Sequence, residues 1–109
     1  MKHNKLVKMI SSKLMERGLV VENELPLPFG KGATDISCSL NNKYLFHAEI
    51  KESPSTINQK GVRKQLEKYE GFFGKGPDYI LISPGSSEII VQNLSGKKLN
   101  LNDYFSNLK

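Results

Sequence analysis

Hydrophobic residues near the start of the chain recur with the spacing of an α-helix. Over residues 3–17 they share one helical face, and lysines occupy the other faces. Arg17 and Gly18 favour an end to this helix, because a cation suits the last turn and glycine readily takes a positive φ just after it. The pattern predicts a first helix with an apolar face made of Leu6, Val7, Ile10 and Leu14.

A short run of β-forming residues and a loop come next. Residues 19–24 have the composition of a strand. Pro26 and Pro28 end it, because proline has no N–H to donate to a neighbouring strand. Residues 28–32, with a lysine between two glycines, then have the composition of a loop.

Two longer apolar runs, residues 33–40 and 44–51, lie on either side of Asn41-Asn42-Lys43. Asparagine tolerates the left-handed backbone that a tight turn requires. The pattern therefore predicts a β-hairpin with a three-residue turn.

The second half of the chain begins with a further helical pattern. Residues 56–59 match a capping box, and the apolar residues that follow keep helical spacing. Residues 79–83 are typical of a buried strand, 88–92 of a shorter strand, and 101–108 of a terminal helix or turn. The predicted apolar face of the second helix consists of Val62, Leu66, Tyr69 and Phe73.

The order of these elements is helix, three strands, helix and strand, followed by a short tail. Such an order is typical of an α/β fold in which helices flank a central mixed sheet. A chain of 109 residues forms one core, so we expect a single domain over residues 1–109.

The hairpin places two acidic residues together. With a turn of three residues Leu40 faces Tyr44, and counting outward sets Asp35 opposite Glu49. Directly opposed residues share a face of the sheet, about 4.5–5.5 Å apart at Cβ. Lys51 lies on the same face, because side chains alternate along a strand.

This trio suits phosphodiester chemistry. Two neighbouring carboxylates repel each other unless a cation lies between them, and Mg²⁺ favours one or two carboxylates together with waters and phosphate oxygens. Lys51 could orient a water or stabilise a developing anion. The alternative is an ordinary solvated face, because Glu-x-Lys is common in strands by chance.

Composition adds weaker evidence. The formal charge of +5 attracts polyanions such as nucleic acid, although such an excess also serves solubility. The single cysteine, Cys38, rules out an internal disulfide and fits a reducing compartment. No apolar run approaches the roughly 20 residues of a membrane helix, so we expect a soluble, cytoplasmic protein with no membrane partner.

Asp35-Ile36, then Glu49-Ile50-Lys51 after an apolar strand, with a helix before and a helix after, resembles the PD-(D/E)XK nuclease superfamily. The resemblance covers about residues 3–83 and implies a restriction-endonuclease-like core. It further implies DNA hydrolysis with Mg²⁺ or Mn²⁺ held by Asp35, Glu49 and the backbone carbonyl of Ile50, and assisted by Lys51.

Within that superfamily, Gln65-Leu66-Glu67-Lys68-Tyr69 resembles the Q-x-x-x-Y motif of RecB-like nucleases. Gln65 and Tyr69 share a helical face, where the resemblance gives Gln65 a catalytic role and Tyr69 a contact to DNA. For Tyr69 a place in the core is the alternative. The compact layout is also similar to archaeal Holliday-junction resolvases.

The chain departs from the superfamily pattern at two places. Thr34 stands where the motif has proline. The first helix lacks the acidic residue that members often carry, and has only His3 and Asn4 at its start. Glu22 or Glu24 on the first strand could supply a third acid, although the ordinary reading of each is a surface carboxylate.

Further basic residues flank the proposed site. His47 shares the face of Glu49 if the strand is regular, and it either touches the site or is a structural histidine. Phosphate contacts supply most nonspecific affinity for nucleic acid. The predicted contacts are Lys31, Lys60, Arg63, Lys64, Tyr69 and Lys75.

The first expectation is therefore a metal-dependent deoxyribonuclease acting in DNA processing, recombination or repair. The alternative is a noncatalytic nucleic-acid-binding domain with the same fold, and a weaker option is an interaction module in a larger assembly. A homodimer would suit two-fold DNA substrates.

Overall fold

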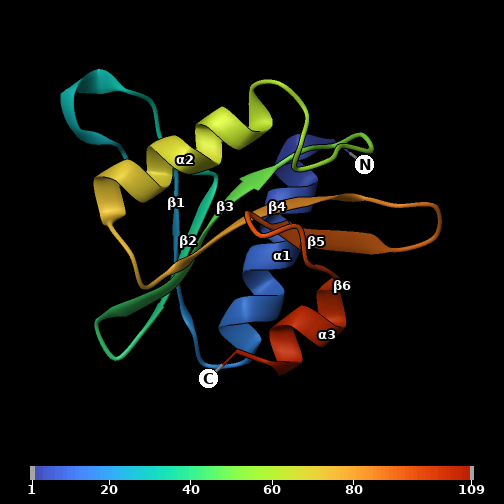
Figure 1. The fold of residues 1–109 in the computed structure, drawn as a ribbon. Coiled ribbons are helices and arrows are strands. Elements are labelled where there is room, and N and C mark those ends of the chain that lie inside the picture. Colours follow the sequence, from blue (N-terminus) through green and yellow to red (C-terminus); the bar gives the residue numbers. More distant parts are fainter. Residues whose placement is uncertain (1, 109) are drawn as a thin grey trace.

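The computed structural model describes residues 2–108, which form three α-helices, a short 3₁₀ turn and six strands. In chain order the elements are α1 (His3–Glu16), β1 (Val20–Asn23), η1 (Pro28–Gly30), β2 (Ile36–Leu40), β3 (Lys43–Ile50), α2 (Val62–Phe73), β4 (Asp78–Pro84), β5 (Ile89–Asn93), β6 (Lys98–Asn100) and α3 (Leu101–Ser106). Figure 1 shows them as one layered unit.

All six strands belong to one sheet, in the order β1-β2-β3-β4-β5-β6. Neighbouring strands are antiparallel except β3 and β4, which are parallel and joined through α2. The predicted α/β class, a mixed sheet flanked by helices, is confirmed. The strand β6 was not predicted, because a three-residue strand carries too little periodicity to be recognised.

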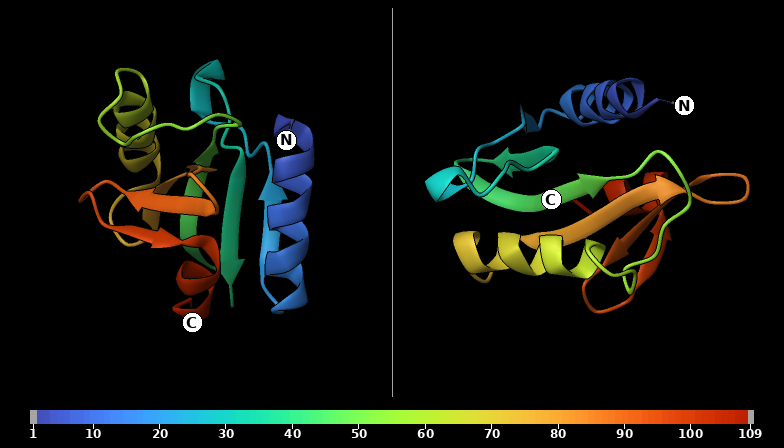
Figure 2. Two further views of the ribbon diagram at one scale, coloured as in Figure 1. Left: turned by 90° about the vertical axis from the view of Figure 1, so that its right-hand side faces the viewer. Right: turned by 90° about the horizontal axis from the view of Figure 1, so that it is seen from above.

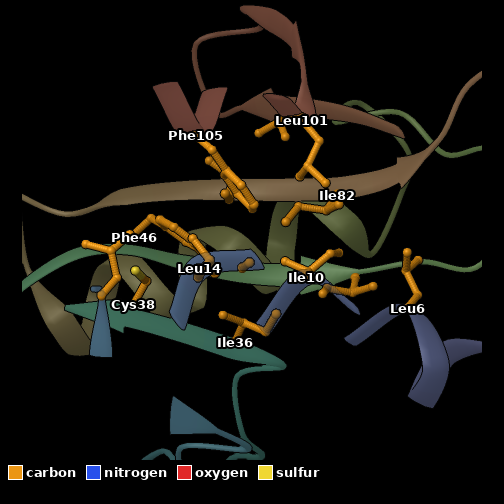
Figure 3. Packing of buried hydrophobic residues seen from close by; sticks show 14 residues of the cluster. Leu6, Ile10, Leu14, Ile36, Cys38, Phe46, Ile82, Leu101 and Phe105 are labelled. Carbon is orange, nitrogen blue, oxygen red and sulfur yellow. The ribbon is translucent and has the colours of Figure 1, made fainter. Parts of the chain in front are cut away.

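The helices cover both faces of the sheet, with α1 and α2 on opposite sides (Figure 2). Apart from Asp78 at the start of β4, which accepts a hydrogen bond from the Tyr104 hydroxyl of α3, the face toward α1 and α3 carries mainly apolar side chains from the four inner strands, because side chains alternate along each strand. Figure 3 shows how these strand residues meet the helices. They are Ile36, Cys38, Phe46, Ala48, Ile50, Ile80, Ile82 and Val91, packed against Leu6, Ile10, Leu14, Leu101 and Phe105.

The face toward α2 has a different composition. Its apolar cluster is smaller, and buried polar side chains from β2, β3, β4 and β5 lie on the same side of the sheet. The cluster contains Leu27, Ile57, Val62, Leu66, Tyr69, Tyr79 and Leu81, and the buried polar residues are Ser37, His47, Ser83 and Gln92.

The predicted length of the hairpin turn was wrong. Leu40 pairs with Lys43, not Tyr44, because Asn41 and Asn42 both adopt positive φ, 53° and 65°, and close a two-residue turn. A bulge between Cys38 and Ser39 on the β2 side then passes over one residue of β3, Leu45. The bulge restores the predicted alignment, and Ile36 pairs with Ala48.

The start of the second helix also differs from the prediction. The capping-box contact exists, since Gln59 accepts a hydrogen bond from the Thr56 N–H at 2.9 Å. It closes a separate turn, however, and α2 begins only at Val62 after Gly61, which has a φ of 94°. That conformation interrupts a right-handed helix, so the loop after β3 is longer than the sequence indicated.

Candidate functional site

The two predicted acidic residues come together at the end of β3. Asp35 directly precedes β2, and its Oδ2 accepts a hydrogen bond from the Ile50 N–H at 2.7 Å. Glu49 is the penultimate residue of β3. After burial, the charge of Asp35 is the next largest cause of the raised pKa of Glu49, so the two carboxyl groups lie close together. The structure therefore places both acids on one side of the sheet.

Glu49 lies in an environment that disfavours its charge. Its side chain is only 14% exposed, and burial, followed by the charge of Asp35, raises its pKa to about 7. Lys51 offsets this effect only in part, because its Nζ lies 3.9 Å from Glu49 Oε1 and is itself substantially exposed. A cation beside these carboxylates would relieve the repulsion.

Tyr69 holds Glu49 from the helix side. Its hydroxyl lies 2.8 Å from Glu49 Oε2 and 3.2 Å from the carbonyl oxygen of Ala33. A hydroxyl has one proton, and the shorter contact to an anionic acceptor is the stronger one. Gln65 Nε2 donates to the Tyr69 hydroxyl at 3.2 Å, so the predicted shared face of the Q-x-x-x-Y pair is a direct contact.

The Tyr69 ring is fully buried in the cluster under α2. It therefore offers no surface for the predicted contact with DNA, and the residue acts on the site through its hydroxyl. Burial also raises the pKa of Tyr69, so the phenol stays protonated and remains a donor.

His3 is a site residue that sequence reasoning missed. It is the first residue of α1, and its Nε2 lies 3.4 Å from Asp35 Oδ2. Its backbone N–H donates to Glu52 Oε2 at 3.0 Å, which ties the helix to the loop after β3. The signal was present in the sequence, because His3 stands where the resemblance leads one to look for an acid.

The two alternative acids have other surroundings. Glu22 accepts a hydrogen bond from the Tyr44 hydroxyl at 3.1 Å, near the hairpin turn. Glu24 is exposed and adopts a φ of 53° just after β1. Between them, Asn23 reaches the backbone oxygen of Asp35 at 3.4 Å. The side chain that approaches Asp35 from α1 is thus His3, a nitrogen donor.

A pocket of about 410 Å³ opens beside the acids. It is polar and open to solvent on one side, which suits a charged substrate more than an apolar ligand. Four of the predicted site residues contribute to its wall. The lining residues are Ala33, Glu49, Lys51, Lys60, Gly61, Val62 and Gln65.

The loop between β3 and α2 forms one wall of this pocket and is fixed by Gln92 of β5. The Gln92 amide accepts from the Ile57 N–H at 3.1 Å and donates to the Ser55 carbonyl at 2.9 Å. Gln92 is 3% exposed, so breaking either bond would leave a buried polar group without a partner. Sequence reasoning missed it, because one glutamine in a short strand gives no sign of burial.

His47 is a structural residue. It is fully buried, its ring stacks on Phe73 at 3.8 Å, and its Nδ1 lies 2.7 Å from Ser37 Oγ. Ser37 Oγ in turn lies 2.8 Å from Thr34 Oγ1, which completes a buried polar chain. Burial lowers the pKa of His47 to about 4, so the imidazole is neutral at neutral pH.

The predicted phosphate-contacting residues do not share one environment. Lys60 lines the pocket, and Lys31, Lys64 and Lys75 are exposed. Arg63 makes a structural contact, because its Nη2 donates to the Leu94 carbonyl at 3.1 Å. The guanidinium thereby links α2 to the segment after β5.

The donor set fits a hard divalent cation held by few protein ligands. Among residues 2–108, no three His, Cys, Asp or Glu side chains are grouped so that they could hold a metal ion. Mg²⁺ commonly uses one or two carboxylates and takes its other ligands from water and substrate phosphate, and Asp35 and Glu49 supply such a pair. The carbonyl of Ile50 stays a predicted ligand.

No protein family, no curated protein and no solved structure matches this chain. None of the helices over residues 2–108 has the length and apolar character needed to cross a membrane.

Proposed function

We propose that this chain is a metal-dependent nuclease of the PD-(D/E)XK type that hydrolyses DNA phosphodiester bonds with Mg²⁺ or Mn²⁺. Its order of elements from α1 to β4 is the αβββαβ order that the resemblance implies for a restriction-endonuclease-like core. The acids lie where that resemblance requires them, before β2 and near the end of β3.

One observation carries the proposal: the carboxyl groups of Asp35 and Glu49 lie together beside a pocket that Glu49 lines, and the pKa of Glu49 is raised to about 7 by burial and by Asp35. A site that served only stability would pair each acid with a cation or replace one of them. Perturbed carboxyl groups in a pocket are typical of functional sites.

The residues of the site take the following roles in the proposal. Asp35 and Glu49 would hold the divalent cation, which supplies charge neutralisation at the scissile phosphate and acidifies water. The Lys51 ammonium stabilises the negative charge that develops on the phosphate oxygens. Tyr69 fixes the orientation of the Glu49 carboxylate, and Gln65 positions Tyr69 from the rim of the pocket.

The test compares wild type with Glu49→Ala on plasmid, single-stranded and branched DNA, with Mg²⁺, with Mn²⁺ and with EDTA. We expect cleavage by wild type in either metal and at least a hundredfold loss in the variant, because one of two carboxylate ligands is gone. Circular dichroism should show an intact fold, since the carboxylate adds little to the core. Equal cleavage by both proteins would refute the assignment.

A noncatalytic nucleic-acid-binding domain is the second candidate. The small number of metal-ligating side chains in the described part of the chain favours it, as does a histidine in place of the expected acid on α1. It predicts salt-sensitive DNA binding that needs no metal and gives no products. The same gels separate the two candidates, because only the nuclease converts the plasmid.

The proposal includes a cytoplasmic location, with which the single free cysteine, Cys38, is compatible. Two-fold substrates such as DNA junctions would suit a homodimer, in which two sites act on opposite strands. Light scattering of the purified protein at several concentrations tests that arrangement, and a constant monomer mass would exclude it.

A further inference from the structure

Four large hydrophobic side chains are exposed among residues 2–108: Met15, Val20, Phe29 and Phe72. The two aromatic ones lie at the α2 side of the molecule, and Phe29 is 90% exposed. A phenylalanine ring left in water forgoes the favourable free energy of burial, so two exposed rings near each other are candidates for contacts with a partner.

The loop that carries Phe29 is held firmly. The Leu27 N–H donates to the Gly32 carbonyl at 2.8 Å, and Leu27 itself is buried in the cluster under α2. Lys68 of α2 donates to the Lys31 carbonyl at 2.7 Å. Phe29 has a φ of 60°, a conformation that L residues avoid, and the loop maintains it. The ring is therefore presented outward by a fixed backbone.

The flank of α2 beside this loop is basic and aromatic. At 100° per residue, Lys68 and Phe72 lie between the outermost lysine, Lys64, and the pocket residue Gln65. The acids Glu67 and Glu70 fall on the other flank. The surface that meets the loop thus carries three lysines and two exposed rings: Phe29, Lys31, Lys64, Lys68 and Phe72.

This surface is continuous with the candidate site. Ala33 lines the pocket of the acids, and its carbonyl lies 3.2 Å from the Tyr69 hydroxyl. Ala33 is four positions after Phe29, so the two Cα atoms are at most about 14 Å apart. Figure 1 shows this loop beside α2, toward the C-terminal end of the helix, whereas the loop after β3 leads into its N-terminal end.

We infer that this basic and aromatic surface binds single-stranded nucleic acid by stacking unpaired bases on Phe29 and Phe72 while the exposed Lys31 and Lys64 contact phosphates and Lys68 holds the loop. The inference rests on the proposed function and gives its substrate class: DNA with an unpaired segment next to the scissile phosphate. Interleaved cations and exposed rings are the means by which proteins bind single strands without sequence preference. A blunt duplex keeps its bases stacked inside and gains only the phosphate contacts.

The chain contains no tryptophan, so Phe29→Trp creates a single fluorescent reporter on the loop. Titration in EDTA with a single-stranded oligothymidylate of about 12 nucleotides should quench its emission in a saturable way, because the indole stacks on bases. The same length of blunt duplex, and heparin as a polyanion without bases, should quench far less. A strand of RNA tests whether the sugar matters.

The matched control is Val20→Trp, an exposed position on β1 that is 56% accessible and outside this surface. It should not respond to the single strand. Equal quenching of both reporters, or equal quenching of Phe29→Trp by heparin, would show that the rings do not stack on bases. A blue shift with anionic phospholipid vesicles and no response to the oligonucleotide would assign the loop to a membrane surface and overturn the inference.

The double variant Phe29→Ala with Phe72→Ala should bind the single strand about tenfold more weakly, with duplex binding unchanged. Unchanged single-strand affinity would overturn the inference even if the protein cleaves DNA. Conversely, quenching of Phe29→Trp without any metal-dependent product would retain this surface while the nuclease proposal fails. The two ideas therefore fail in separate experiments.

Discussion

The two faces of the sheet differ in composition although they are built from the same strands. Toward α1 and α3 the inner strands present mainly apolar residues, most of them almost completely buried, and Asp78 at the start of β4 is bonded to the Tyr104 hydroxyl. Toward α2 the same strands present Ser37, His47, Glu49, Ser83 and Gln92 among fewer apolar side chains. One face resembles the core of any small domain, and the other combines a core with a site.

The difference teaches where stability and chemistry reside in this molecule. Burial of apolar area stabilises the fold from the α1 side, whereas the α2 side contains groups whose burial costs free energy unless they are paired. Glu49 and the unpartnered Nε2 of His47 are such groups. A face that retains such groups is less stable than an apolar one, which indicates a function. Four substitutions can test this division between a stabilising face and a functional face.

The largest effect should come from Phe46→Ala on the apolar face. Phe46 is fully buried and packs edge-on against Tyr104 at 5.8 Å between ring centroids, so its loss leaves a cavity. We expect the free energy of unfolding to fall by about 3–5 kcal/mol in urea titrations. Met15→Ala, at a 55% exposed position, should change it by less than about 0.5 kcal/mol.

Activity separates the faces further. Cleavage per folded molecule of Phe46→Ala should equal that of wild type at a temperature well below its unfolding midpoint. If the specific activity fell as far as it does in Glu49→Ala, the two faces would not be independent and the division would be wrong.

Glu49→Gln should have the opposite effect on stability. The folded pKa of Glu49 is raised to about 7 from 4.5, so its favourable contribution is complete below pH 4.5 and is lost as the pH rises through 7. In EDTA at pH 8 the neutral amide should therefore stabilise the protein by about 2–3 kcal/mol, and it should also abolish cleavage. A variant less stable than wild type under these conditions would show that Glu49 is a structural acid.

Metal binding provides the corresponding measurement on wild type. Mn²⁺ at pH 8 should raise the unfolding midpoint of wild type, because the cation binds the folded state. The midpoint of Glu49→Gln should change little. Equal shifts in both proteins would place the metal elsewhere.

His47 should produce a pH dependence of the opposite sign. The pKa of His47 in the folded protein is lowered to about 4 from 6.5. Between pH 6.5 and pH 4 the imidazole is therefore protonated in the unfolded chain but neutral in the folded protein. Stability should fall by up to about 3 kcal/mol between pH 6.5 and pH 4. Glu49 masks this loss in wild type, since its contribution grows over part of the same range.

The measurement therefore uses Glu49→Gln as the background. Thermal unfolding of that variant between pH 7 and pH 4 should show the full loss, and Glu49→Gln with His47→Asn should show a flatter profile. Identical profiles with and without the imidazole would mean that His47 is protonated in the fold, and the polar face would then contain one less buried neutral group.

The sequence could predict five of the strands and the meeting of the two acids, because alternation marks the strands and the hairpin brings the acids together. It could not predict how the alignment is achieved. A two-residue turn and the bulge at Leu45 each shift the register by one, and the shifts cancel. Turn length and bulges depend on twist and packing, which leave no mark in a hydrophobic pattern.

Other parts of the site could not be predicted because they join distant segments. His3 meets Asp35 only through the packing of α1 on the sheet, and Gln92 reaches the loop after β3 across β4. A single polar residue in either segment is indistinguishable from a surface residue by pattern alone. The Gln65–Tyr69 pair was predictable, since residues four apart on a helix are neighbours.

The smallest expected effect tests whether Tyr69 belongs to the site or to the core beneath it. Tyr69→Phe keeps the buried ring and removes the hydroxyl that donates to Glu49 Oε2. That hydrogen bond lowers the pKa of Glu49, so its loss should raise the pKa of Glu49 further. In a plot of cleavage rate against pH, the rise on the acid side should then move to higher pH. One lost bond of about 1 kcal/mol corresponds to somewhat less than one pH unit.

The matched control is Tyr104→Phe, which removes a phenol hydrogen bond to Asp78 at 3.0 Å on the α3 side and should leave the profile unchanged. An equal loss of stability in both variants with no change in either profile would make Tyr69 a core residue, because a purely structural hydroxyl has no means of altering the protonation of Glu49.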